Sequence, residues 1–138
     1  MNRTRALDYL SGLPAFAAYL ALAIVLALVF VAIYVRLTPH PEIRLIREGN
    51  AAAAASLGGA LIGFAIPLAS AIENSVSLPD MLLWAAVALA VQLIGYLLAR
   101  AAVRDLSRQI EQGTLAAGIF LGAVAIAIGL LNAASMTY

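Results

Sequence analysis

Residues 13–35, LPAFAAYLALAIVLALVFVAIYV, form an unbroken run of uncharged and mostly aliphatic side chains. The hydrocarbon core of a bilayer is about 30 Å thick, and about 20 helical residues are needed to cross it. This run is therefore long enough to cross a membrane once as a helix. Pro14 suits the first turn of such a helix, because the N–H group that proline lacks would have no partner there.

The charged residues fall in clusters, and the gaps between clusters mark further spans. The uncharged gaps hold 27, 24, 19 and 27 residues, and they lie between Asp8 and Arg36, Glu48 and Glu73, Asp80 and Arg100, and after Glu111. Each gap is long enough for one crossing. We therefore predict an all-α membrane protein with four transmembrane helices, near Leu13–Val35, Asn50–Ile72, Asp80–Ala99 and Thr114–Ser135. Gly49 and Gly113 precede Asn50 and Thr114, which both fit as helix N-caps.

The composition excludes several classes of protein. Hydrophobic residues make up 64% of the 138 residues and charged residues 11%, whereas soluble domains carry roughly 25% charged residues. One integral domain spanning residues 1–138 and solvated by the lipid bilayer is expected. The net charge of +1 gives no basic field for a nucleic acid partner. Cysteine is absent, and the lone His40 is expected to be an ordinary loop residue, so we predict no metal site and no cofactor.

The arginines predict an orientation. Six of the eight lie in the first and third loops: Arg36, Arg44, Arg47, Arg100, Arg104 and Arg108. Because arginine concentrates on the cytoplasmic side, these loops are expected inside and both termini outside. Arg3 and Arg5, directly ahead of the first helix, favour the opposite orientation. The six loop arginines are also a candidate surface for anionic lipid or for a cytoplasmic protein partner.

The two halves of the chain resemble each other at a shift of 64 residues. The shift aligns Arg36 with Arg100, Arg44 with Arg108, Ile46 with Ile110, and Gly49 with Gly113. It predicts two tandem helical hairpin repeats, over about 9–72 and 73–138. Because each repeat holds two helices, the two hairpins would be parallel-oriented and related by an axis along the membrane normal.

Small residues recur in the second and fourth expected helices. Gly59 and Gly63 form one G-x-x-x-G pair, and Gly118 and Gly122 form another. In lipid, helices associate through close van der Waals packing, and small residues let two backbones approach. We predict that these glycines pack helices together, either within one chain or at the seam of a homo-oligomer.

Several motifs resemble the YjfL-like inner-membrane family, a bacterial domain of unknown function whose members look like tandem two-helix units. They are the segments 37–42 (LTPHPE), 45–50 (LIREGN), 67–70 (PLAS), 80–84 (DMLLW), 92–93 (QL) and 129–134 (GLLNAA). The resemblance runs from about Tyr34 to the C-terminus. It implies a location in the bacterial inner membrane, and it implies no reaction and no catalytic residues.

Few polar residues fall within the spans, and each needs a reason because a polar group in the bilayer costs free energy. Gln92 is predicted either to bond a neighbouring helix or to line a polar path. Asn132 is predicted either to contact a carbonyl freed by Pro67 or to join that path. Glu73 and Asp80 flank the outer turn, where they either concentrate cations at a pore mouth or are simply solvated.

No catalytic motif is present, so we do not expect an enzyme. Two functions remain. One is a homo-oligomeric channel or transporter that passes a small cation or polar solute by Gln92. The other is a structural or regulatory scaffold that recruits partners through its Arg-rich cytoplasmic loops.

The predicted orientation can be tested because the chain contains no cysteine. We expect a cysteine introduced by Tyr138→Cys to react with an impermeant thiol reagent applied from outside, and one introduced by Gln109→Cys to be protected. Labelling of position 109 with position 138 protected would reverse the assignment.

Overall fold

The computed structural model describes residues 3–136, so Tyr138 lies outside the described residues. These residues form helices α1 (Arg3–Ser11), α2 (Leu13–Leu37), α3 (Glu42–Arg47), α4 (Ala51–Asn74), α5 (Leu78–Ala102), α6 (Leu106–Glu111) and α7 (Leu115–Ser135). Within the described range there is no strand. By length and composition, four stretches suit a membrane crossing: α1 with α2, then α4, α5 and α7. The prediction of an all-α protein with four membrane-crossing helices is confirmed.

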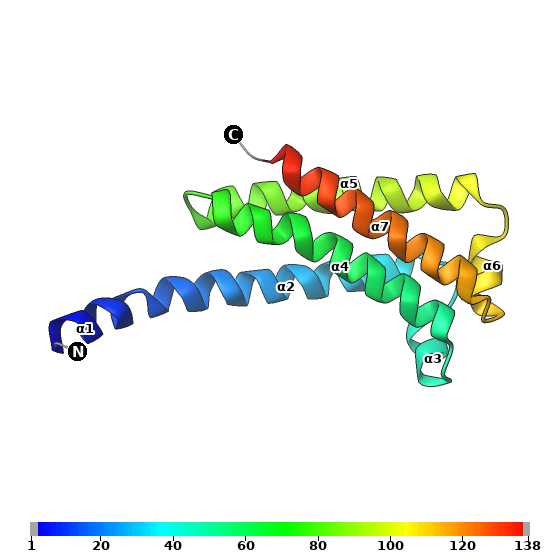
Figure 1. The fold of residues 1–138 in the computed structure, drawn as a ribbon, viewed down its shortest axis with the longest axis horizontal. Coiled ribbons are helices and arrows are strands. Elements are labelled where there is room, and N and C mark those ends of the chain that lie inside the picture. The colour runs from blue at the N-terminus through cyan, green and yellow to red at the C-terminus, as the bar shows by residue number, and fades with distance from the viewer. Residues whose placement is uncertain (1–2, 137–138) are drawn as a thin grey trace.

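The four long helices form an elongated bundle with the short helices α3 and α6 at one end (Figure 1). The N-terminus, the turn between α4 and α5 and the end of α7 all lie away from that end. We call the end with α3 and α6 the loop end. The arginine distribution predicts that this end faces the cytoplasm.

Both connections at the loop end contain a short helix that the charge pattern did not reveal, because six residues are too few to show a helical period. Each helix is closed by a glycine in the left-handed region, Gly49 with φ 85° and Gly113 with φ 82°, where a side chain would be strained. The Gly49 N–H donates to the Ile46 carbonyl over 3.0 Å, and that of Gly113 to the Ile110 carbonyl over 2.9 Å. The same turn therefore occurs twice.

The helix caps agree with the sequence only in part. The Asn50 side chain accepts a hydrogen bond from Ala53 N–H over 2.9 Å, so its predicted capping role is confirmed. Thr114 is the N-cap residue of α7 as predicted, but its side chain makes no capping bond. Helix α5 starts earlier than Asp80, because Ser77 caps it by accepting from the Asp80 N–H over 3.3 Å.

Helices α4 and α7 pack along each other, and glycine makes this contact close. A Cβ placed on Gly59 would collide with the backbone of Gly122, one on Gly118 with that of Ala52, and one on Gly63 with that of Ala125. The structure thus places the predicted glycines where two backbones touch within one chain. A larger side chain at any of them would force the helices apart.

Helix α2 has its fully buried residues in its last turns, while Tyr19, Leu22 and Leu26 are only partly buried against the core. Phe30 and Tyr34 are its buried residues, and Phe30 stacks on Phe64 of α4 with ring centroids 4.6 Å apart. The first part of α2 extends away from the other helices (Figure 1). An apolar groove of about 340 Å³, lined by residues including Phe16 and Ile72, lies beside it.

We expect Gly59→Ala and Gly129→Ala each to lower the stability of the detergent-solubilised protein by about 1–3 kcal/mol, the usual cost of overpacking. At Gly129 the added methyl group would collide with the carbonyl of Gly63. Gly58→Ala is the matched control, since a Cβ there meets no atom within 4 Å and alanine favours the helix by up to about 1 kcal/mol. Thermal unfolding of the three variants measures the difference. Equal melting temperatures would show that the close contact does not hold the fold.

Candidate functional site

The most deeply buried ionisable groups lie at the loop end, in the connection between α2 and α3. His40 is 2% exposed and Glu42 is 0% exposed, and His40 Nε2 lies 2.9 Å from Glu42 Oε1. Glu42 is the first residue of α3, so the bend at residues 38–40 brings the two side chains together. His40 does lie in a loop as predicted, but its burial and its partner were missed. The sequence feature that could have indicated this pair is the segment PHPE at 39–42, in which a glutamate follows the histidine by two residues.

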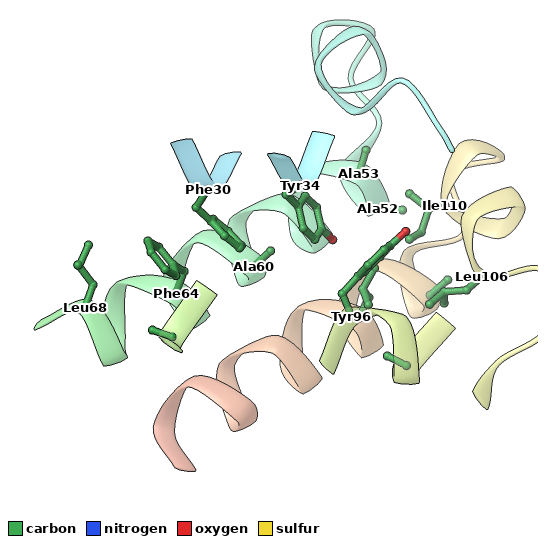
Figure 2. Close-up of a cluster of buried hydrophobic side chains, with 14 of the residues drawn as sticks. Phe30, Tyr34, Ala52, Ala53, Ala60, Phe64, Leu68, Tyr96, Leu106 and Ile110 are labelled. Atoms are coloured by element: carbon green, nitrogen blue, oxygen red, sulfur yellow. The ribbon is translucent and has the colours of Figure 1, made fainter. Parts of the chain in front are cut away.

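Two tyrosines from different helices cover this pair. Tyr34 of α2 and Tyr96 of α5 are 2% and 5% exposed, and their rings meet edge to face with centroids 5.2 Å apart. Figure 2 shows them next to each other in the core. The Glu42 charge lies near enough to act on both phenols. The tyrosines thus complete a buried polar cluster, which we define as Tyr34, His40, Glu42 and Tyr96.

Each member of the cluster has a buried polar atom without a hydrogen-bond partner among the described residues. These atoms are Tyr34 Oη, His40 Nδ1, Glu42 Oε2 and Tyr96 Oη. A buried polar group without a partner costs about 1–3 kcal/mol, and such groups are rare in native proteins. The cluster therefore carries hydrogen-bonding capacity that the fold uses only in part, since Ser56 lies near Glu42, and Ser107 and Arg100 lie near Tyr96.

The electrostatic setting of Glu42 favours its neutral form. Burial raises the pKa of the Glu42 carboxyl above its usual value, whereas hydrogen bonds with His40 and Ser56 and the charge of His40 act in the opposite direction. Burial is the largest of these effects. A carboxyl in this position can exchange a proton nearer to neutral pH than an exposed one.

Gln92 lies further along α5 and is 3% exposed. Its Nε2 donates to the Ala125 carbonyl of α7 over 2.9 Å, while Oε1 has no partner among the described residues. Beside it is a cavity of about 10 Å³ bordered by Tyr34 and Tyr96, which is close to the minimum space for one water molecule. Gln92 therefore joins two helices and also adjoins the polar cluster.

The other predicted polar residues lie apart from this site. Glu73 is exposed, and Asp80 is partly buried and accepts from the Val76 N–H over 3.1 Å. Among the described residues Asn132 Nδ2 has no hydrogen-bond partner, so it makes no hydrogen bond to a carbonyl freed by Pro67. The hydrogen bond that joins α4 to α7 in this region is instead made by Ser70 Oγ, which donates to the Ala133 carbonyl over 3.2 Å.

Apolar side chains fill the core between Gln92 and the end of the bundle opposite the loop end. Phe64 and Leu68 on α4, and Met81 and Ala85 on α5, are buried there. The structure therefore does not bring Glu73, Asp80 or Asn132 together with Gln92.

The six loop arginines are all exposed. Arg44 Nε lies 3.8 Å from Glu48 Oε1 with both side chains mostly in solvent, and such exposed pairs contribute little. Arg100 and Arg108 border a cleft of about 500 Å³ that also reaches His40. Within residues 3–136, no three metal-binding side chains come together.

The Glu42 environment predicts how stability depends on pH. The folded-state pKa of Glu42 is raised above the ordinary value of 4.5, so the contribution of its neutral form is full below pH 4.5 and is lost as the pH rises through the folded pKa. Glu42→Gln should remove this loss. We expect its melting temperature to fall less than that of the parent protein between pH 4.5 and neutral. The exposed Glu48→Gln should follow the parent, and parallel curves for the parent and Glu42→Gln would contradict the assignment.

Comparison with known proteins places this arrangement in a family. Residues 8–136 match the family described as Domain of Unknown Function (DUF350). The chain is 41% identical over 129 residues to the "UPF0719 inner membrane protein YjfL" of Escherichia coli strain K12, and equally to the protein of that name in Escherichia coli O157:H7. Each alignment covers 94% of this chain and 98% of the relative. No solved structure is significantly similar. The resemblance seen in the sequence motifs is thus confirmed, and the chain belongs to the YjfL-like family described as DUF350.

Proposed function

We propose that this protein is a non-catalytic, homo-oligomeric transport protein of the bacterial inner membrane that passes a small cation or polar solute. The observation that carries the proposal is the buried His40–Glu42 pair at the loop end. Ionisable groups buried in membrane proteins are costly and typically mark the routes of ions, protons or substrates.

The location is supported by sequence relatives and by the helices. The curated relatives are named as inner membrane proteins and align over nearly their whole length. Four stretches of this chain have the length and composition to cross a membrane. Both features favour a multi-pass protein of the inner membrane.

The route is supported by polar groups that follow one another into the bundle. Glu42 begins it at the loop end, Tyr34 and Tyr96 lie next, and Gln92 is one helical turn further along α5 from Tyr96. Three of these residues border the same small cavity: Tyr34, Gln92 and Tyr96. Beyond Gln92 the core is apolar, which corresponds to a closed state of the route. Protons, cations and small solutes would pass only when this packing rearranges.

Assembly of several copies is supported by the unpartnered first part of α2. Phe16 is 63% exposed and Leu28 is 64% exposed, and the groove beside α2 is apolar. A bundle of four helices encloses little space by itself, so a wider passage requires a second copy. Lipid would cover whatever surface remains.

We also propose that the fold is a tandem repeat. Helix α6 follows α3 at the same 64-residue shift that aligns Gly49 with Gly113. The matching hydrogen bonds that close the two turns support a common ancestor for the hairpins.

The alternative function is a scaffold, and the exposed loop arginines favour it. Six positive side chains at one end suit an acidic protein surface or anionic lipid. On this reading His40 and Glu42 only fix the loop that presents the arginines. Flux measurements separate the two functions, because a scaffold needs no solute to cross the membrane.

We expect the purified oligomer in liposomes to raise the flux of at least one probe among protons, sodium, potassium and a small uncharged polar solute. Glu42→Gln removes the ionisable carboxyl while keeping its shape, so the flux should fall about tenfold, a change of about 1.4 kcal/mol in the barrier. Gln92→Leu should lower it as well. Dye-loaded vesicles report ions, and light scattering reports solute entry.

The control for this experiment is Glu48→Gln, which removes an exposed carboxylate from the same loop and should leave the flux unchanged. Each variant must give the parent's oligomer size. A folded oligomer that transports none of the probes, or a Glu42→Gln variant as active as the parent, would favour the scaffold.

A further inference from the structure

The cleft at the loop end has walls of both charge signs. It lies between the segment that carries His40 and the α5–α6 connection, and its volume is about 500 Å³. Its charged or ionisable residues are His40, Arg100, Asp105, Arg108 and Glu111. This volume falls within the range of about 300–1,000 Å³ that small-molecule sites occupy.

The opposite charges around the cleft do not pair with one another. In the part of the chain that the structure describes, the charged pairs within 4.0 Å are His40 with Glu42 and Arg44 with Glu48. Arg100 and Arg108 therefore have no carboxylate partner, and Asp105 and Glu111 have no cationic partner, while Arg100 also lies beside the Tyr96 phenol. A ligand of one sign would meet both attraction and repulsion here, whereas a ligand that carries both signs would be attracted at both ends.

His40 adds a buried polar atom to the wall of this cleft. The ring is held by Glu42 through Nε2, which leaves Nδ1 as its other nitrogen, buried and without a partner. When Nδ1 carries a proton it can donate to an anionic oxygen. Glu42 of α3 holds the imidazole, and Tyr34 of α2 and Tyr96 of α5 lie near enough to Glu42 to sense its charge. His40 therefore borders the cleft and carries a buried ring nitrogen that has no partner among the described residues.

Asp105 lies at the rim in an unfavourable backbone conformation. Its φ of 56° makes it the one residue other than glycine with positive φ in the described range. Its side chain makes no capping bond to α6, so the conformation is not explained by local hydrogen bonding. Strained residues of this kind cluster at ligand sites. Here the strain directs the chain so that an acidic residue borders the cleft.

We propose that this cleft binds a small zwitterion, with its anionic group on Arg100, Arg108 and His40 and its ammonium group on Asp105 and Glu111. A free amino acid and the phosphoethanolamine headgroup of a lipid share this chemistry. A zwitterion would be the solute of the proposed transport function, and the biological role of the cleft rests on that function. The binding step itself is measured without any transport.

The test uses the full-length oligomer, purified in detergent and depleted of lipid. Isothermal titration compares glycine and glycerophosphoethanolamine, which carry both charges, with acetate and methylammonium, which carry one. We expect at least one zwitterion to bind about tenfold more tightly than both single-sign probes. Binding of glycine alone identifies a free solute, and binding of glycerophosphoethanolamine alone identifies a lipid headgroup.

Variants of each charged wall test the assignment of the two ends. Arg108→Gln and Asp105→Asn should each weaken zwitterion binding about tenfold, and Arg108→Lys should retain more binding than Arg108→Gln because it keeps the charge. Glu48→Gln, an exposed acid outside the cleft, should bind like the parent. Melting temperatures without ligand show whether each variant is folded.

Three results would overturn the proposal: no binding of either zwitterion, equal binding of the single-sign probes, or equal losses in Glu48→Gln and Asp105→Asn. Zwitterion binding without flux in liposomes would contradict the transport function and support the binding site. Flux of ions without zwitterion binding would contradict the binding site and support the transport function.

Discussion

The contact between the backbones of α4 and α7 is the constraint on which the rest of the structure depends. Lipid solvates leucine as well as a protein core does, so helices in a membrane gain little from hiding apolar surface and depend on close packing. Gly59 against Gly122 and Gly63 against Gly129 supply that packing. Helix α5 then packs beside both helices, which brings Gln92 within hydrogen-bonding distance of the Ala125 carbonyl.

The loop end follows from this same contact. Helices α4 and α7 run in the same direction, so their N-terminal ends lie together, and the connections that lead into them meet. The Asn50 side chain joins these connections, since its Nδ2 donates to the Ile110 carbonyl over 2.9 Å while its oxygen caps α4. With the connections tied down, His40 and Glu42 are buried near Tyr34 and Tyr96. The buried pair is thus a product of helix packing some distance away.

The sequence was sufficient for the helices and insufficient for the site, and the reason is physical. Membrane-spanning helices can be recognised from local composition alone. The sequence predicts one at 50–72, and the structure has α4 at Ala51–Asn74. The pairing of His40 with Glu42 depends on a bend and on two tyrosines from other helices, which no local pattern encodes. Asn132 illustrates the same limit, because its neighbours are set by how α4 and α7 cross. Gly59 and Gly122 were recognisable as packing residues, but the sequence left open whether their partner helix belonged to the same chain.

The length of the first apolar stretch links this protein to the thickness of its membrane. The uncharged residues 9–35 number 27, which at 1.5 Å per residue is about 40 Å of helix against a hydrocarbon core of about 30 Å. Such an excess is accommodated by tilting or bending, to a degree set by the local bilayer. Because the first part of α2 has few neighbours to hold its angle, a thinner membrane tilts it further. Tyr34, near its other end, lies close enough to Glu42 to sense its charge, so a change in the tilt of α2 would reach the surroundings of the buried carboxyl.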